Sequence, residues 1–243
     1  MIDIHCHLLP GIDDGPGTFE EAVALCRAVA AEGCTAALAT PHQHHELWWN
    51  GEPTRLAELL TQLRAAVGTE LDLHAGAEIH VGAGTLDDLD RWPAGELVPL
   101  AGSRWVLLEF NRLEPTTDPY ALIHELVVAG WRPILAHPEE YAWLAEDPQL
   151  LDRLIARGAR LQITAANFLG ERGRGLAERC RALLAADQVH FLASDAHGTA
   201  RRPPRLAAAA RELARRFGDE VAHRLTTLHP SAILHDRPLP LES

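Results

Sequence analysis

The chain has 243 residues, of which 47% are hydrophobic and 23% charged, as in folded proteins large enough to bury a substantial core. Its net charge of −12 at pH 7 would repel a nucleic-acid backbone and an anionic membrane surface. All 22 basic residues are arginine, and the lack of lysine excludes Schiff-base chemistry and the lysine-dependent phosphate loop of nucleotide hydrolases.

The cysteines and the apolar segments indicate the compartment. Four cysteines show no C-x-x-C spacing: Cys6, Cys26, Cys34 and Cys180. No basic-then-apolar leader opens the chain, and no apolar run approaches the ~18 residues needed to cross a bilayer. We therefore expect a cytoplasmic protein without membrane insertion.

Short apolar segments alternate with longer amphipathic segments about seven times along the chain. The predicted strands cover residues 1–5, 35–40, 71–75, 105–110, 133–136, 160–163 and 190–193. The predicted helices cover residues 18–33, 54–67, 85–91, 118–129, 148–157, 171–186 and 204–217, and a last helix begins near residue 219. In the first of these helices, Thr18 and Glu21 have the spacing of a capping box.

This alternation predicts the fold class. Strands separated by helices form parallel sheets with right-handed crossovers, and seven such units fit a closed or nearly closed barrel better than an open sheet. The Pro- and Gly-rich segments 9–17, 92–102 and 201–204 are predicted as loops, not linkers. We expect an α/β, TIM-like barrel that forms one domain over residues 1–243.

Histidine and acidic residues follow the predicted strands at their carboxyl ends, which face one side of a parallel barrel. These residues are His5, His7, Asp14, His42, Glu78, Glu109, His137, Asp195 and His197. Each has an ordinary explanation alone, since H-x-H is a weak motif and a buried glutamate can pair with an arginine. Burying four carboxylates together without cations would be very costly, so their convergence predicts a polynuclear metal centre.

The donor types limit the metal. Imidazole and carboxylate donors without thiolate suit Mn, Fe, Zn or Co, and the set can hold two or three divalent ions that keep an open position. His5 and His7 point the same way along a strand, whereas Cys6 points to the opposite face. The other histidines are expected on the surface or in the core. For His44 and His45 the alternative is that they line the entrance to the metal site.

These residues resemble the polymerase and histidinol phosphatase (PHP) family. The segments Met1–His7 and Ile12–Pro16 resemble its branch of manganese-dependent protein-tyrosine phosphatases, which are linked to bacterial capsule and exopolysaccharide synthesis. Further matches are Thr40-Pro41-His42, Gly76-Ala77-Glu78-Ile79, Leu108-Glu109-Phe110, Ala136-His137-Pro138-Glu139, Ala193-Ser194-Asp195-Ala196-His197 and Arg202-Pro203-Pro204. The resemblance spans nearly the whole chain and implies a distorted barrel of seven strands, (βα)7, as the alternation predicts.

The resemblance also implies a division of the donors among three Mn²⁺ ions. His5, His7, Glu78 and Asp195 would hold one ion. Glu78 would bridge to a second ion held by Glu109 and His137. Asp14, His42 and His197 would hold the third.

One position departs from this branch. The branch usually has His-x-Glu-Arg-Tyr after the fifth strand, with the arginine contacting phosphate, but here Glu140 replaces that arginine. Arg202 is retained and is expected to be the catalytic, phosphate-binding arginine. Either Arg112 or Arg172 substitutes for the missing arginine, or activity toward phosphotyrosine is weak.

The hypothesis that follows is a phosphatase in which a metal-bridging hydroxide attacks phosphorus in line, while the ions and Arg202 neutralise the equatorial oxygens. Four carboxylates against three divalent ions leave a centre of roughly +2, which attracts an anionic monoester. The resemblance implies a phosphotyrosyl protein as substrate, namely the tyrosine-rich tail of a bacterial tyrosine autokinase. The oligomeric state is not indicated.

Other classes are excluded or kept as alternatives. A cysteine-dependent phosphatase needs C-x₅-R, and no arginine lies six residues after any cysteine. No G-x-S-x-G motif of a serine hydrolase occurs. Two alternatives remain open: another PHP phosphoesterase, such as a histidinol phosphatase, and a non-catalytic binding domain stabilised by metal, which the change at Glu140 supports.

Overall fold

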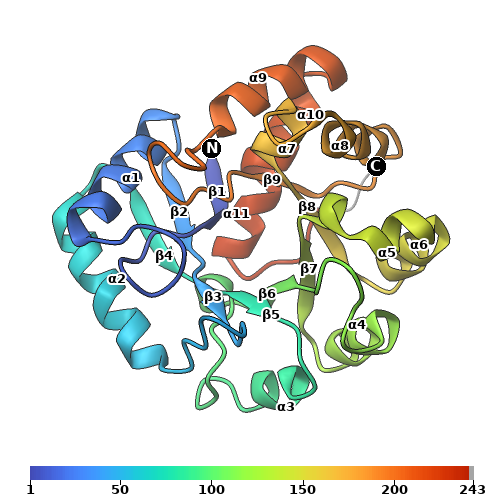
Figure 1. Cartoon of the computed structure of the whole chain (residues 1–243), viewed down its shortest axis with the longest axis horizontal. Coiled ribbons are helices and arrows are strands. Elements are labelled where there is room, and N and C mark those ends of the chain that lie inside the picture. Colours follow the sequence, from blue (N-terminus) through green and yellow to red (C-terminus); the bar gives the residue numbers. More distant parts are fainter. Residues whose placement is uncertain (241–243) are drawn as a thin grey trace.

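The computed structural model describes residues 1–240 and arranges them as strands surrounded by helices (Figure 1). The strands are β1 (Ile2–Cys6), β2 (Ala36–Ala39), β3 (His42–Gln43), β4 (Asp72–Ala75), β5 (Glu78–His80), β6 (Trp105–Glu109), β7 (Arg132–Ala136), β8 (Arg160–Thr164) and β9 (Phe191–Ala193). The helices are α1 (Phe19–Ala31), α2 (Pro53–Val67), α3 (Thr85–Asp90), α4 (Pro119–Val128), α5 (Ala142–Glu146), α6 (Pro148–Ala156), α7 (Ala165–Leu169), α8 (Arg174–Ala185), α9 (Leu206–Phe217), α10 (Asp219–His223) and α11 (His229–Leu234). Short helical turns are η1 (Leu100–Gly102), η2 (Pro138–Glu140) and η3 (Arg224–Leu228).

All strand pairs within residues 1–240 are parallel, in a three-stranded sheet β1-β2-β4 and a six-stranded sheet β3-β5-β6-β7-β8-β9. β2 runs on into β3 and β4 into β5, so the two sheets share two bent strands. On the other side, Cys6 of β1 pairs with Ala196, which follows β9. Two backbone bonds reinforce this pairing, from Asp195 N–H to the His5 carbonyl (2.8 Å) and from His7 N–H to the Ala196 carbonyl (2.9 Å). The described chain therefore forms a ring of seven parallel strands, which confirms the expected barrel.

The bends occur at residues that weaken a regular strand. Pro41 separates β2 from β3 and has no N–H to donate. Gly76 separates β4 from β5, and a Cβ there would lie 2.9 Å from Leu100 Cδ2, so glycine allows the strand to approach η1. The segments 35–40 and 71–75 were predicted as simple strands; the continuations β3 and β5 were not expected because each has only two or three residues.

The predicted helices are present with ends shifted by up to a few residues. Thr18 and Glu21 form the expected capping box at the start of α1, with each side chain bonded to the backbone of the other. The predicted last helix is interrupted, because α10 and α11 are joined by the π-helical turn η3. The short helices α5 and α7 were not predicted. No helix of the described chain is long and apolar enough to span a bilayer.

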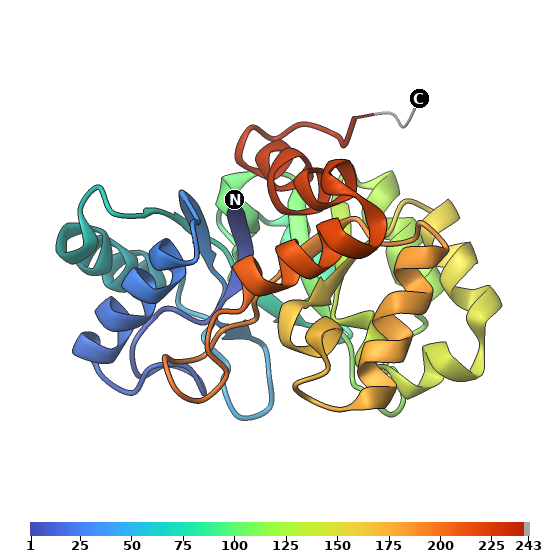
Figure 2. The same ribbon diagram turned by 90° about the horizontal axis from the view of Figure 1, so that it is seen from above.

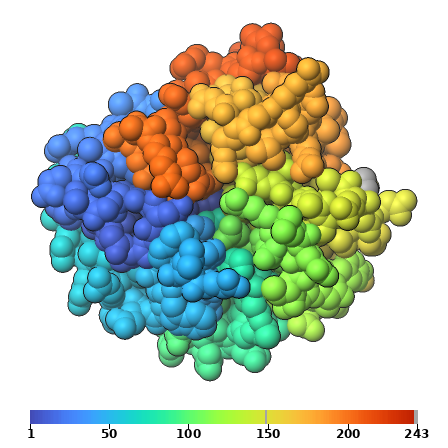
Figure 3. Space-filling model, in the orientation of Figure 1, coloured from blue at the N-terminus to red at the C-terminus, as the bar shows by residue number. Residues whose placement is uncertain are grey.

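The last helices cover one end of the barrel. Ile233 of α11 belongs to a buried cluster with Ile2, Ala36, Trp105 and Phe191, which begin or lie near the beginning of their strands. Figure 2 shows η3 and α11, in red, on the side of the N-terminus. The amino ends of the strands are thus covered, and the carboxyl ends face loops on the opposite side. Figure 3 shows that loop face in space-filling form, where orange, light-blue and green segments meet near its centre.

Candidate metal centre

His5 and His7 lie at the carboxyl end of β1 and both are fully buried. Their Nε2 atoms are 3.3 Å apart, and each lies 3.3 Å from Glu78 Oε2. The same two nitrogens lie 3.5 and 3.6 Å from Asp195 Oδ1, which follows β9. Cys6, between the histidines, packs instead in an apolar cluster, as the alternation along the strand predicts.

Glu78, at the start of β5, occupies the middle of the site. Its Oε1 lies 2.8 Å from His137 Nε2, and its Oε2 lies 3.1 Å from His42 Nδ1. Burial by itself would raise the pKa of Glu78, but His5 and His42 hold it well below its ordinary value. Glu109, at the end of β6, lies 3.5 Å from His42 Nδ1 and 3.9 Å from His137 Nε2.

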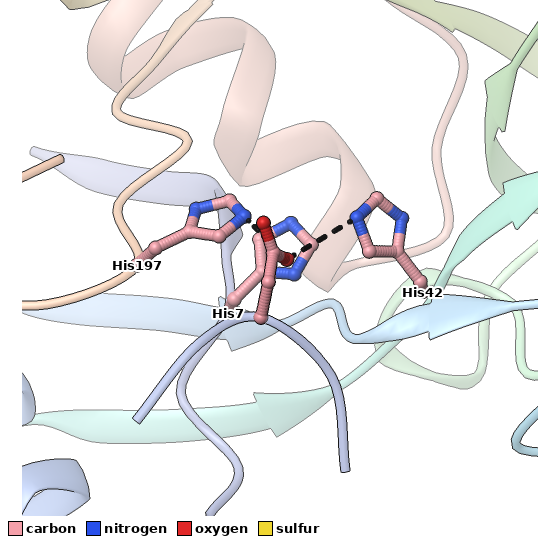
Figure 4. Close-up of side chains that lie close together, drawn as sticks. His7, His42 and His197 are labelled. Carbon is pink, nitrogen blue, oxygen red and sulfur yellow. Dashed lines mark ion pairs between the residues drawn. The ribbon is translucent and has the colours of Figure 1, made fainter. Parts of the chain in front are cut away.

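Asp14 lies between two further histidines. Its Oδ1 is 3.1 Å from His197 Nε2 and 3.5 Å from His42 Nε2. Figure 4 shows His7, His42 and His197 turned toward one another from separate segments. The rings of His7 and His197 stack with centroids 3.8 Å apart. The structure therefore brings all nine predicted donors into one continuous cluster.

The backbone turns sharply where several of these residues leave their strands. His137 after β7, Asp195 after β9 and the nearby Arg202 have φ angles of 33°, 53° and 51°. Left-handed backbone at non-glycine residues costs roughly 1–3 kcal/mol each, and such residues often cluster at functional sites. Here the turn directs the side chain of each residue toward the cluster.

The donor geometry fits bound cations. The donor atoms form groups whose members lie within 4.8 Å of one another: His7, Asp14, His42 and His197; His5, His7 and Asp195; His42, Glu78 and Glu109. Asp14 Oδ1, His42 Nδ1 and Asp195 Oδ1 are buried close to other donor atoms of the cluster, but none of the three makes a hydrogen bond of good geometry. Such orphaned atoms are costly unless something binds them.

The protonation of two of the histidines, His42 and His137, supports the same conclusion. Burial would lower the pKa of His42, but Glu78, Asp14 and Glu109 raise it to about 11. Burial would also lower the pKa of His137, but Glu78 outweighs this effect and raises the pKa to about 9. Without metal, the carboxylates draw protons onto these imidazoles. Divalent cations would supply that positive charge, and a His and carboxylate set without thiolate suits Mn, Fe, Zn or Co.

Asp13 and Gln162 orient His7 and His5 by hydrogen bonds to the Nδ1 atoms, which face away from the cluster. Neither contact was predicted from the sequence. Asp13 Oδ2 accepts a hydrogen bond from His7 Nδ1 (2.8 Å), and Gln162 Oε1 accepts one from His5 Nδ1 (2.9 Å). A proton on Nδ1 leaves the Nε2 lone pair free to bind a cation. Gly15 keeps the Asp13 loop close, because a Cβ at this position would lie 2.8 Å from the His7 carbonyl oxygen.

A cavity of about 520 Å³ opens above the cluster on the loop face. Several predicted donors line it, together with the aromatic residues Trp48 and Phe110. His45 also lines the cavity, whereas His44 does not. His44 instead stacks on Trp49 and lies 3.2 Å from Glu96, so the expectation of an entrance histidine holds only for His45.

Arginines supply the positive charge at the cavity edge: Arg112, Arg172, Arg201 and Arg202 line it. Arg202 pairs with Asp195, and its Nη1 lies 2.7 Å from His197 Nε2 and 3.6 Å from Asp14 Oδ2. It therefore stands directly over one side of the donor cluster.

Residues 1–235 match the family described as "Capsular polysaccharide synthesis, CpsB/CapC". The chain belongs to this family. Among CpsB/CapC relatives, the tyrosine-protein phosphatase YwqE of Bacillus subtilis is 33% identical over 229 residues, covering 93% of this chain and 89% of YwqE. The tyrosine-protein phosphatase CpsB of Streptococcus pneumoniae is 31% identical, covering 98% and 99% of the two chains. The resemblance to the capsule-linked branch is confirmed.

Solved structures agree with this CpsB/CapC assignment. A crystal structure from the pair YwqE and CpsB, described as "unique metal-dependent tyrosine phosphatases", matches with a TM-score of 0.90 and 31% identity over 100% of both chains. The histidinol phosphate phosphatase of Lactococcus lactis, solved with zinc, has a TM-score of 0.58 at 13% identity, covering 93% of this chain and 96% of that one. The second likeness shows that the fold is shared.

Proposed function

We propose that this chain is a metal-dependent protein-tyrosine phosphatase that hydrolyses phosphotyrosine monoesters. The observation that carries the proposal is the buried cluster of histidines and carboxylates at the open end of the barrel, beneath an arginine-lined cavity. CpsB/CapC relatives with nearly full coverage carry the name tyrosine-protein phosphatase, which supports the substrate class. The proposed catalytic unit is one domain over residues 1–243.

We further propose three divalent ions, Mn²⁺ by resemblance. The distances support His5, His7, Glu78 and Asp195 for one ion, and a bridging Glu78 with Glu109 and His137 for the second. Asp14, His42 and His197 would hold the third. His42 Nδ1 also borders the second group, so its ring lies between the two.

Bound divalent cations lower the pKa of water to about 7 and stabilise negative charge on phosphoryl oxygens. Arg202 would contact the phosphate from the side of Asp14 and Asp195, where its guanidinium already lies. Asp13 and Gln162 would keep His7 and His5 in the metal-binding tautomer. Trp48, stacked on His42 with rings 5.1 Å apart, would form a wall beside the phenyl ring of the substrate.

The physiological partner we propose is the phosphotyrosyl tail of a bacterial tyrosine autokinase of capsule or exopolysaccharide synthesis, and the proposed compartment is the cytoplasm. The family description refers to capsular polysaccharide synthesis, which supports this pathway. An extended, tyrosine-rich tail is suited to a cavity that opens onto a loop face.

The test combines metal analysis with two substrates. We expect the purified protein to contain Mn²⁺ or a related ion and to hydrolyse a phosphotyrosyl peptide faster than histidinol phosphate. Asp195→Ala should lose both bound metal and turnover. Metal binding without any hydrolysis would leave only the non-catalytic alternative, and a preference for histidinol phosphate would point to the other PHP phosphoesterase.

A further inference from the structure

Glu140 is an acidic residue in contact with two arginines that line the cavity, and under the proposed function this cavity takes an anionic substrate. It ends the turn η2, three residues after the proposed ligand His137. Its side chain is only 5% exposed. A buried anion at this place would repel a phosphate unless neighbouring cations outweigh it.

Two arginines of the cavity bind this carboxylate. Arg112 Nε lies 3.2 Å from Glu140 Oε2, and Arg172 Nη1 lies 3.0 Å from Glu140 Oε1. Burial would raise the pKa of Glu140, but His137, Arg112 and Arg172 lower it below the ordinary value. Glu140 is therefore ionised, and together with the two guanidinium groups it carries a net positive charge.

The contact orients Arg112. Its Nε is used by Glu140, while its Nη2 extends to 4.0 Å from Glu109 Oε1 in the donor cluster. Arg202 approaches the same cluster at Asp14 and Asp195. The two guanidinium groups thus reach different sides of the carboxylate cluster, and both line the cavity.

Glu140 is itself held in place. Asn167, fully buried in α7, donates through Nδ2 to Glu140 Oε1 (2.8 Å) and to Glu139 Oε1 (2.9 Å). Glu139 also accepts a hydrogen bond from Thr164 N–H (2.8 Å). A carboxylate tied down in this way limits the rotamers of Arg112, whose side chain is otherwise half exposed.

We propose that Arg112 is a second phosphate-binding side chain and that Glu140 is its positioning residue, with Arg172 balancing the charge of Glu140. The ligand class is the oxyanion of a phosphate monoester or of inorganic phosphate, bound in the cavity between Arg112 and Arg202. This inference rests on the proposed function for its catalytic consequence, but it also predicts phosphate binding that is measurable without turnover.

The kinetic test uses Glu140→Gln, Arg112→Gln and the double variant on an aryl phosphate. For Arg112→Gln we expect a loss of about 10²-fold in kcat/KM, as for other charge-stabilising donors. For Glu140→Gln we expect a loss of roughly 10-fold, and the double variant should resemble Arg112→Gln because Glu140 acts through Arg112. Glu140→Asp should recover part of the activity. The control, Arg174→Gln, alters an arginine that is 91% exposed and paired with Glu178, and should leave kcat/KM unchanged.

The sign of the Glu140→Gln effect decides between two models. If the carboxylate merely repels the substrate, removing its charge will raise kcat/KM, and the proposal is wrong. Additive losses in the double variant would also contradict it.

A second measurement separates this inference from the proposed function. Calorimetric titration of the metal-loaded protein with inorganic phosphate should show at least 10-fold weaker binding for Arg112→Gln and weaker binding for Glu140→Gln, with metal content unchanged. If the wild-type protein binds phosphate in this way but hydrolyses no ester, the proposed function fails and the anion site stands. If wild-type protein binds no phosphate, or Arg112→Gln binds it equally well, the anion site is refuted.

Discussion

Asp13 offers the sharpest test of how the metal centre is organised, because it supports the site without lining the cavity. Its Oδ2 bonds His7 Nδ1 (2.8 Å) and accepts the backbone N–H of His42 (3.2 Å). Its Oδ1 accepts the backbone N–H of Gly15 (2.9 Å). One carboxylate therefore fixes the tautomer of one proposed ligand and the backbone of another.

Asp13→Asn keeps the shape of this side chain but replaces one acceptor oxygen by an amide NH₂ and removes the charge. If the NH₂ faces Gly15, one hydrogen bond is lost and two donors oppose each other. If it faces His7, the imidazole must place its proton on Nε2 and can no longer bind a cation there. Loss of such a supporting contact typically weakens metal affinity about 10- to 100-fold. This corresponds to roughly 1.4–2.7 kcal/mol.

The assay is a competition between the protein and a coloured chelator for Mn²⁺. Asp118→Asn is the matched control, because Asp118 also accepts two backbone N–H groups, from Tyr120 and Ala121, but caps α4 at a position where asparagine is equally good. An Asp13→Asn protein that folds and binds Mn²⁺ as tightly as the control would refute the role assigned to Asp13 in supporting His7.

Three further outcomes are expected. Arg202→Ala should lower kcat/KM for an aryl phosphate about 10²-fold while the amount of bound metal stays unchanged. Retained activity would mean that another residue binds the phosphate. Trp48→Ala should raise KM for a phosphotyrosyl peptide roughly 3- to 10-fold, and an equal effect on a phosphoseryl peptide would argue against a ring contact. Iodoacetamide at neutral pH should leave turnover intact, because burial raises the pKa of every cysteine thiol; mass spectrometry of the treated protein shows whether inactivation, if seen, follows thiol labelling.

The sequence was sufficient to predict most of the barrel, because the hydrophobic period and the capping residues are local signals. The bends at Pro41 and Gly76 were not predicted, since the continuation of each strand is too short to show a period. The nine donors were predicted because a parallel barrel gathers the carboxyl ends of its strands, and this topology alone makes them neighbours.

The supporting contacts depend on tertiary distances that no local pattern carries. Gln162 is 157 positions from His5, and nothing in its own segment indicates that it bonds an imidazole. From the sequence alone, Glu140 is only the loss of an arginine, whereas the structure shows a carboxylate that binds Arg112 and Arg172. The charge of a residue can be read from sequence, but its electrostatic effect depends on what surrounds it.

The line where the first and last strands of the ring meet has a consequence for the whole molecule. Few backbone bonds join β1 to the segment after β9, yet His5 and His7 stand on one side of that line and Asp195 and His197 on the other. A cation bound by residues on both sides of this junction would cross-link β1 to the segment after β9. Resistance to heat should then rise with the concentration of free metal, and chelation should first loosen the barrel along this join.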